Sequence, residues 1–324
     1  MTLSAPLHID AKAEVDRLGG LLRDQVLRDL RRKGIVVGIS GGVDSAVVAG
    51  VCARALGPER VLGLLMPERD SSPDSLRLGR EAAAAVGVET VVEDVGPALA
   101  ALGCYDRQVR AIQAVFPDYG DGWRCKLTLP PRLDTDRLNI FQLTVQPPAG
   151  EPRTARMPAS AYQALVAATN MKQRVRKLLE YTHADRVGFA VAGTPNRLEY
   201  ELGFFVKSGD GAADVKPIAH LYKTQVYALA EALGVPEEIR RRPPTTDTYS
   251  LPQSQEEFYF SLPYQKMDVA LFARDAGASA DEAAGPLGLT PEQVTRVYKD
   301  IDQKRAQARY LHAPPMLIGG EPPT

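Results

Sequence analysis

The chain has 324 residues, of which 44% are apolar and 24% charged, a composition typical of a globular protein that buries a core. Its formal net charge of −1 excludes a broadly basic surface for nucleic acid or anionic membranes. Three cysteines (52, 104 and 125) show no C-x-x-C spacing, which excludes a disulfide framework and indicates a reducing compartment. No apolar run is long enough to cross a bilayer and the first residues lack a signal-peptide core, so we expect a cytoplasmic protein with no membrane or nucleic-acid partner.

Short β-branched runs alternate with amphipathic stretches along the N-terminal part of the chain. The predicted elements, in order, are a helix (10–33), a strand (34–40), a helix (43–57), a strand (60–67), a helix (72–87) and a strand (89–95). Farther along, helices are predicted over 171–184 and 223–234, on either side of a strand at 186–194. This alternation predicts an α/β fold, a doubly wound parallel sheet with flanking helices.

Residues 104–160 interrupt this rhythm with β-type residues punctuated by Pro and Gly. We interpret them as an inserted β-rich flap within one domain that spans residues 1–324. An irregular surface loop is the alternative, although loops of this length are uncommon in compact domains unless they are functional.

The C-terminal part, residues 265–312, is predicted to be helical. Thr290 is placed to cap a helix, with Pro291 in the first turn and Gln293 at the capping-box position. Together with the stretch 279–289, this helix has the look of a DNA-reading helix-turn-helix. Acidic side chains dilute its basic face, so we favour a structural helix pair; they are Glu292, Asp300 and Asp302.

The sequence SGGVDS, residues 40–45, stands between the first predicted strand and the next helix. Its two glycines leave backbone N–H groups uncovered and the helix adds the positive end of its dipole, so the turn suits a phosphate chain. Asp44 would repel phosphate directly, but it fits a Mg²⁺ ion held between its carboxylate and the phosphates. The pattern is neither G-x-x-x-x-G-K-[ST] nor G-x-G-x-x-G, which excludes kinase-like and dinucleotide loops. The alternative is a tight strand–helix turn capped by Asp44.

SGGVDS resembles the pyrophosphate-binding loop of the N-type ATP pyrophosphatases, which cleave ATP between the α and β phosphates and have an adenine nucleotide alpha hydrolase-like fold. A second stretch, GTPNRLEYELGFFVKSGDGAADVKPIAHLYKTQVYALAEALGVP (193–236), resembles the core of one member family, the NAD synthetases. The similarity covers 30–100 and 165–312. It implies an ATP-dependent amide ligase that works as a homodimer.

The resemblance also implies roles for individual residues. Asp44 and Glu199 would ligate Mg²⁺, and Asp44, Lys223 and Asp210 would carry the chemistry. The implied ATP contacts are Gly38, Ser40, Gly41, Gly42, Val43, Asp44, Ser45, Met66, Thr194, Lys223 and Thr245. The implied substrate contacts are Asn170, Arg174, Lys207, Asp210, Asp214 and Glu257, with Arg176 nearby. Taken alone, Glu199 could be a solvated charge and Lys223 an ordinary helix start.

The implied chemistry converts a carboxylate into an amide. Hydroxide is a poor leaving group, so the acid is first adenylated by ATP, and ammonia then displaces AMP from the mixed anhydride. Mg²⁺ and Lys223 would neutralise charge on the departing pyrophosphate, and Asp210 would position the ammonium or accept its proton.

The acid that the resemblance favours is nicotinate adenine dinucleotide, which would yield NAD, AMP and diphosphate. The match weakens over 243–268, where Asp247 is retained, Glu256–Glu257 take the place of the family's acidic pair and FYFSLPY replaces its Leu-Gly end. Aromatic residues of this segment could stack on a planar ring or belong to the core. The alternative is therefore a paralogous ligase that amidates another carboxylic acid.

No part of the chain resembles a glutaminase, and the stretch before the first strand is too short for one. We therefore expect free ammonia, or ammonia delivered by a separate glutaminase. A tRNA-thiolating relative would need a reactive cysteine pair and a basic face, which the sequence lacks. A non-enzymatic nucleotide-binding module would bind ATP but release no pyrophosphate.

Overall fold

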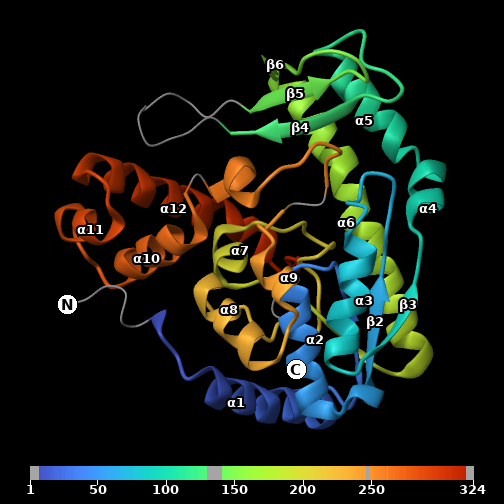
Figure 1. Cartoon of the computed structure of the whole chain (residues 1–324), viewed down its shortest axis with the longest axis vertical. Helices are drawn as coiled ribbons and strands as arrows, with labels where there is room; N and C mark the ends of the chain where they lie inside the picture. Colours follow the sequence, from blue (N-terminus) through green and yellow to red (C-terminus); the bar gives the residue numbers. More distant parts are fainter. Residues whose placement is uncertain (1–6, 130–140, 246–247, 261, 319–324) are drawn as a thin grey trace.

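The computed structural model describes residues 7–129, 141–245, 248–260 and 262–318 (Figure 1). Its centre is a four-stranded sheet in the order β3-β2-β1-β7, in which every pair of neighbouring strands is parallel. The strands are β1 (Ile35–Gly38), β2 (Val61–Leu65), β3 (Glu89–Val92) and β7 (Ala190–Ala192). The predicted doubly wound sheet is confirmed.

One face of the sheet is covered by helices from both halves of the chain. Ile35 and Val37 of β1 point into this layer and are fully buried. Its helices are α1 (Ala11–Asp24), which continues as a π-helical turn (Gln25–Asp29), α2 (Val43–Leu56), α3 (Ser75–Ala85) and α8 (Lys223–Ala232). Gly50 of α2 lets α2 approach the end of α8 closely, because a Cβ at Gly50 would lie 3.1 Å from the side chain of Leu233.

The other face of the sheet is covered by α6 (Ala159–Val187), which begins well before the helix predicted at 171–184. Val36 of β1 points to this side and packs in a cluster with Ala184 of α6. Two further helices lie beside α6, namely α4 (Gly96–Ala101) and α5 (Cys104–Gln113). Figure 1 shows α6 running from a small sheet at the top of the view to the parallel sheet below.

That small sheet is the predicted β-rich insertion. It is antiparallel and three-stranded, with the strands β4 (Arg124–Thr128), β5 (Gln142–Gln146) and β6 (Arg153–Arg156). The insertion opens with α5 rather than with a strand, because the buried residues of that helix recur at helical spacing (Cys104, Gln108, Ala111 and Ile112). Apolar side chains of the sheet, α5 and the start of α6 form one separate core.

The C-terminal part consists of the three helices α10 (Tyr264–Asp275), α11 (Ala280–Leu287) and α12 (Pro291–His312). Thr290 caps α12 as predicted, since its hydroxyl accepts from Gln293 N while the Gln293 side chain accepts from Thr290 N. The three helices share a core with α7 (Arg197–Leu202), which supports the interpretation of α11 and α12 as a structural pair.

Three short turns complete the elements, namely a 3-10 turn (Pro58–Arg60), α9 (Glu237–Arg241) and a π-helical turn (Glu256–Phe260). None of the helices in the described part of the chain combines the length and the apolarity that a bilayer crossing requires.

Candidate functional site

The site lies where the chain leaves β1 and β7. These strands are neighbours in the sheet. After β1 the chain crosses over to β2, on one side of β1, and only much later in the sequence does it form β7, on the other side of β1. Loops after two such strands separate at the carboxyl edge of the sheet, which is where ligands bind in doubly wound folds. A cavity of about 560 Å³ opens at this edge, and Ser40 and Thr194 from the two loops line it.

The loop after β1 has the geometry of a phosphate-binding turn. Gly41 has φ +81°, and a Cβ there would lie 2.8 Å from the carbonyl oxygen of Ser75, so only glycine fits. Gly42 N donates to Ser40 Oγ at 3.3 Å, and Ser45 Oγ lies 3.2 Å from Ser40 Oγ. Gly42 is the N-cap of α2 and supplies no capping side chain. The start of α2 thus presents main-chain N–H groups to the cavity, as an anion site requires.

Asp44, in the first turn of α2, is held by groups from two distant segments. Its Oδ1 accepts from Asn196 Nδ2 at 3.1 Å, and its Oδ2 forms an ion pair with Lys223 Nζ. Lys223 begins α8 and is 2% exposed. Burial opposes the charge of Lys223, but the carboxylates of Asp44 and Glu199 outweigh it and raise the pKa of this lysine. Lys223 is therefore a fixed positive charge beside the phosphate loop.

Glu199 belongs to the same cluster. It forms a capping box with Asn196 at the start of α7, in which Asn196 N donates to Glu199 Oε2 at 3.1 Å. Its other oxygen accepts from Gln255 Nε2 at 3.1 Å. Burial, and then the nearby charge of Asp44, raises the pKa of Glu199 to about 8. Two carboxylates close enough to repel one another would be relieved by a cation.

The donor set of this cluster fits Mg²⁺. Asp44 and Glu199 offer hard carboxylate oxygens, both linked to Asn196 and both influenced by Lys223. The described residues contain no group of three or more His, Cys, Asp or Glu side chains that could hold a metal ion. Mg²⁺ commonly takes one or two protein carboxylates and completes its shell with phosphate oxygens and water, so a nucleotide would supply the remaining ligands.

Most of the predicted ATP contacts line the cavity. They are Gly38, Ser40, Gly42, Val43, Asp44, Ser45, Met66, Thr194, Lys223 and Thr245. Gly41 instead supports the turn through its backbone conformation. Of the predicted substrate contacts, Asn170 and Asp210 line the cavity. Asp210 accepts from Val206 N at 2.7 Å, and burial raises the pKa of its carboxyl.

Three predicted substrate residues do not lie among the described cavity-lining residues, and their contacts are structural. Arg174 Nε donates to the carbonyl of Lys207 at 3.3 Å, and Lys207 Nζ donates to the carbonyl of Tyr310 at 2.9 Å. Asp214 accepts from Val191 N at 2.8 Å. Their roles in substrate binding stay predictions, as does that of Glu257, whose side chain is outside the described residues together with Asp247.

Sequence reasoning missed several residues at the site. Glu180 of α6 lines the cavity beside β1, since a Cβ at Gly38 would lie 2.9 Å from Glu180 Oε1. Lys177 Nζ pairs with Glu180 Oε2 at 2.5 Å. Helical spacing from Asn170 could have identified Glu180, whereas nothing local distinguishes Asn196 or Gln255.

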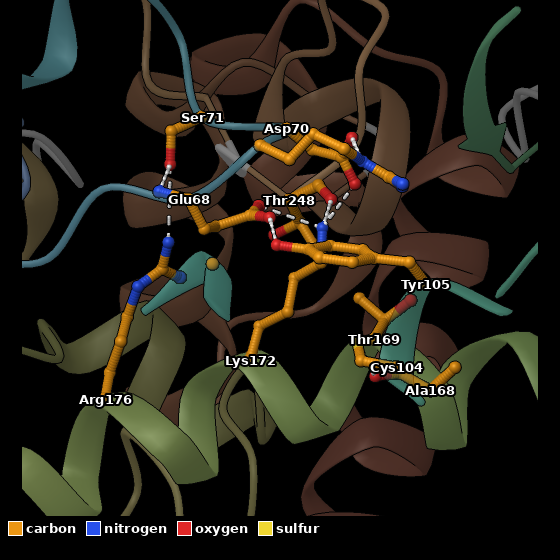
Figure 2. A network of polar contacts seen from close by, with 12 residues as sticks. Glu68, Asp70, Ser71, Cys104, Tyr105, Ala168, Thr169, Lys172, Arg176 and Thr248 are labelled. Carbon is orange, nitrogen blue, oxygen red and sulfur yellow. Dashed lines mark hydrogen bonds and ion pairs between the residues drawn. The ribbon is translucent and has the colours of Figure 1, made fainter. Parts of the chain in front are cut away.

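A buried network supports one wall of the cavity (Figure 2). Lys172 rises from α6 and its Nζ donates to Glu68 Oε1 at 2.9 Å, to Asp70 Oδ2 at 2.6 Å and to the carbonyl of Thr248 at 3.0 Å. The hydroxyl of Tyr105 donates to the other oxygen of Glu68 at 3.0 Å. The side chains of Lys172 and Glu68 are fully buried. The network therefore joins the loop after β2, α5, α6 and the segment that begins at Thr248.

Arg176, one turn farther along α6, fixes the same loop. Its Nε donates to the carbonyl of Met66 at 3.2 Å, and its Nη2 lies 3.5 Å from Ser71 Oγ. Figure 2 shows Arg176 directed toward Ser71. Because Met66, Ser71 and Arg176 all line the cavity, this contact sets the shape of the wall next to the phosphate loop.

Comparisons with known proteins give a consistent result. The family model described as NAD synthase matches residues 14–113 and 145–310. An NH(3)-dependent NAD(+) synthetase of Mesorhizobium japonicum is 63% identical over 96% of this chain and 98% of its own length. One from Rhizobium meliloti is 59% identical over 96% and 93%. The solved NH3-dependent NAD synthetase of Campylobacter jejuni, 22% identical, has a TM-score of 0.60 over 96% of this chain and all of its own, which shows the same fold.

Proposed function

The chain belongs to the NAD synthase family, and from that premise we propose how its cavity makes NAD from nicotinate adenine dinucleotide, ATP and ammonia. Relatives that align with 96% of the chain are ammonia-dependent NAD synthetases, so the chain is an ammonia-dependent ligase. Amidation of a different acid, which the divergent stretch 243–268 had left open, is no longer needed to explain the sequence.

The observation that carries the mechanism is the cluster of Asp44, Glu199, Asn196 and Lys223 at the N-terminus of α2. We propose that the amides of the SGGVDS loop and the start of α2 bind the β and γ phosphates of ATP. Mg²⁺, held by Asp44 and Glu199, would neutralise negative charge on these phosphates. Lys223 adds a positive charge whose position Asp44 fixes.

The first step is adenylation of the acid. A carboxylate oxygen of the dinucleotide attacks the α-phosphorus of ATP, and the bond from that phosphorus to the β-phosphate oxygen breaks. Pyrophosphate leaves with the electron pair. Lys223 stabilises the charge that grows on this leaving group, and a buried, fixed ammonium does so without reorganisation.

The second step is amidation. Ammonia attacks the carbonyl carbon of the acyl-adenylate, AMP leaves with the bonding electron pair, and the nitrogen loses a proton. Asp210 faces the cavity, and burial raises the pKa of its carboxyl, which makes the carboxylate a better proton acceptor. We propose that Asp210 positions the incoming ammonia and accepts the one proton that its nitrogen loses on amide formation.

Three broader features are also part of the proposal. Ammonia reaches the site free or from a separate glutaminase. The working form is a homodimer, as the family resemblance implies. The location is cytoplasmic, which agrees with three free and buried cysteine thiols at positions 52, 104 and 125.

The test is a product assay with the purified chain. Nicotinate adenine dinucleotide, ATP, ammonium and Mg²⁺ together should yield NAD and pyrophosphate in equal amounts. Glutamine in place of ammonium should give no NAD. A chain that binds ATP and the dinucleotide but releases no pyrophosphate would contradict the mechanism.

A further inference from the structure

Residues 248–255, which we call the strap, connect the insertion with the carboxylate cluster of the site. They follow α9 and end where the π-helical turn (Glu256–Phe260) begins. In Figure 1 the strap belongs to the orange segment that reaches β4. Its residues are part of none of the helices or strands given above, so contacts with other segments determine where the strap lies.

One side of the strap is bound to β4 of the insertion. Leu251 N donates to the carbonyl of Cys125 at 3.0 Å, and Cys125 N donates to Ser250 Oγ at 2.9 Å. Two residues farther along β4, the carbonyl of Leu127 accepts from the side-chain amide of Gln253. Alternate residues of an antiparallel strand direct their main-chain groups to the same edge. The strap therefore occupies the edge of β4 that β5 leaves unpaired.

Burial fixes the strap on this edge. Tyr249 is 5% exposed and packs in the apolar core of the insertion, and Gln253 is 4% exposed. Leaving a buried amide without its partner costs about 1–3 kcal/mol, which opposes a shift of the strap along β4. At the start of the strap, Lys172 Nζ binds the carbonyl of Thr248. The strap thus has one favoured position.

The last residue of the strap, Gln255, binds Glu199. Gln255 Nε2 donates to Glu199 Oε1 at 3.1 Å, whereas Asn196 N donates to Glu199 Oε2 at 3.1 Å. The second bond is internal to the capping box of α7, but the first comes from a segment far away in the sequence. Gln255 N also donates to the carbonyl of Pro244 at 3.0 Å, which holds the main chain of Gln255 independently of its side chain. The direction of the Glu199 carboxylate therefore depends on the strap.

The support of the strap lies outside the sequence that the family model matches. β4 (Arg124–Thr128) falls between the two matched ranges, which end at 113 and resume at 145. The strap and Glu199 both fall within the second range. In this chain, an insertion thus holds a segment that contacts a carboxylate of the site.

We propose that the insertion positions the metal site: β4 holds the strap, and Gln255 at the end of the strap directs the Glu199 carboxylate toward the cation. This inference rests on the metal role of Glu199 in the proposed function. Hydrogen-bond partners of a ligating carboxylate commonly contribute about 10- to 100-fold to metal affinity. Gln255 is a positioning residue, because it acts through Glu199.

The experiment measures binding of Mn²⁺, a spectroscopic substitute for Mg²⁺ with the same preference for six oxygen ligands. Electron paramagnetic resonance follows the free ion in the presence of the full chain and a non-hydrolysable ATP analogue, so the readout needs no turnover. Gln255→Met keeps the length of the side chain but removes the donor to Glu199. It should raise the Kd for Mn²⁺ about 10-fold or more.

The same variant should separate metal affinity from the other steps. Affinity for the ATP analogue without metal should not change in Gln255→Met, because the phosphate loop is untouched. In the NAD assay, the Mg²⁺ concentration that gives half-maximal activity should rise by the same factor as the Kd for Mn²⁺. Saturating Mg²⁺ should restore most of kcat, since the lost interaction acts on binding of the ion.

Gln253→Met tests the support from β4, because it removes the donor to the carbonyl of Leu127. Its Kd for Mn²⁺ should rise by a smaller factor. Gln253→Met combined with Gln255→Met should bind Mn²⁺ no more weakly than Gln255→Met alone, since both substitutions act through the strap. Should Gln253→Met not fold, Ser250→Ala replaces it, because this variant removes the acceptor of Cys125 N.

Gln113→Met is the matched control. Gln113 belongs to α5 of the insertion, and its Nε2 donates to the carbonyl of Tyr119 at 2.9 Å. The substitution and the type of hydrogen bond are the same as in Gln253→Met, but the bond lies within the insertion and not between β4 and the strap. The Kd for Mn²⁺ should equal that of the unmodified enzyme.

An unchanged Kd for Mn²⁺ in Gln255→Met, a neutral Gln253→Met, or equal losses in Gln113→Met and Gln253→Met would each overturn the proposal. If the unmodified enzyme binds no Mn²⁺ with the ATP analogue, the metal role in the proposed function fails, and the positioning role fails with it. If the unmodified enzyme binds Mn²⁺ and makes NAD but Gln255→Met is neutral in both assays, only the positioning role fails.

Discussion

Asp44 has two roles in the proposed mechanism, as the counter-charge of Lys223 and as an oxygen ligand for Mg²⁺. Asp44→Asn keeps the size of the side chain and an oxygen that can accept from Asn196, but it removes the charge. We expect pyrophosphate release to fall by about 100-fold or more, the usual effect of losing one electrostatic group at a reaction centre. The measurement is initial pyrophosphate release at saturating ATP and dinucleotide.

The control for this variant is Asp16→Asn, which alters an exposed carboxylate that pairs with Arg54 on the surface. It should leave the rate unchanged. Thermal unfolding of Asp16→Asn should match that of the unmodified enzyme, whereas Asp44→Asn should unfold at a lower temperature because buried Lys223 loses its ion-pair partner, so the rates are compared well below both transitions. Full activity of Asp44→Asn would refute the metal and counter-charge roles together.

The carboxyl of Glu199 should make the affinity of the site for Mg²⁺ depend on pH. Burial and Asp44 raise the pKa of its carboxyl to about 8, so without metal the group is largely protonated at pH 7. Mg²⁺ needs the carboxylate and must displace this proton. Affinity for Mg²⁺, measured with a non-hydrolysable ATP analogue, should therefore rise from pH 6.5 through pH 8 and level off about one pH unit above the pKa of Glu199.

Calorimetry at pH 7 in two buffers of different ionisation enthalpy should detect the released proton. The amide in Glu199→Gln carries no negative charge and has no titratable proton. The variant should therefore bind Mg²⁺ more weakly, and its Mg²⁺ affinity should lose this part of the pH dependence. A flat affinity across the same pH range in the unmodified enzyme would show that Glu199 does not ligate the ion.

Among the secondary-structure elements, α6 is held in position by a buried charge, the ammonium group of Lys172. Lys172→Met leaves Glu68 and Asp70 buried without their shared cation. Removing one partner of a buried pair costs about 3–5 kcal/mol, so the free energy of unfolding should fall by this amount in urea titrations. Lys12→Met, on the exposed side of α1, should change it by less than about 0.5 kcal/mol.

A second variant separates the buried charge from simple loss of packing. Combining Lys172→Met with Glu68→Gln and Asp70→Asn removes the two carboxylate charges that lose Lys172 and should recover part of the lost stability, although Asp70 also pairs with Arg69. If the single variant is as stable as the unmodified chain, the network in Figure 2 contributes nothing to the position of α6.

The elements themselves were largely predictable, because their signals are local. β-branched residues bounded by glycine identified β1, and Thr290 with Gln293 identified the start of α12. The extent of α6 was not, because its first turns directly follow the Pro-containing β-type stretch of the insertion and were interpreted as part of it, although α6 itself contains neither Pro nor Gly. A buried lysine is harder still. Lys172 lies between Asn170 and Arg174, two implied substrate contacts. Its own partners are Glu68, Asp70 and Thr248, which no local pattern connects with it.

The same limit applies to the site. A motif fixes the order of residues and not the direction of their side chains. Asp44 and Glu199, implied to share a metal ion, do lie close enough for their charges to interact. Arg174 and Lys207, implied as substrate contacts by the same resemblance, instead donate to main-chain carbonyls. Asp210, in the same loop region as Lys207, does face the cavity.

On the scale of the whole molecule, the site ties together the two halves of the chain. Asp44 belongs to the first half, and Asn196, Glu199 and Lys223 belong to the second. Mg²⁺ and ATP at about 100 times their dissociation constant should therefore raise the free energy of unfolding by about 2.7 kcal/mol, since they bind only the folded chain. One cooperative transition should shift as a unit, as followed by circular dichroism.

Lys223→Ala is the variant that tests this linkage, because it should weaken ATP binding and so reduce the shift. ADP-ribose, which lacks the triphosphate, should give little stabilisation. Two separate transitions, of which ATP shifts only one, would contradict the cooperative unit.

Asn196 restricts which amino acids the family can tolerate at this position. Its oxygen accepts the N–H of Glu199 to start α7, and its amide nitrogen donates to Asp44, so one buried side chain is both acceptor and donor. Aspartate would begin the helix equally well but would add a third negative charge, whereas serine and threonine are too short to span both partners. Exchange for another common N-cap residue is harmless at most helix starts, but it should not be tolerated at Asn196. We expect a related chain with serine or aspartate at this position to have no ligase activity.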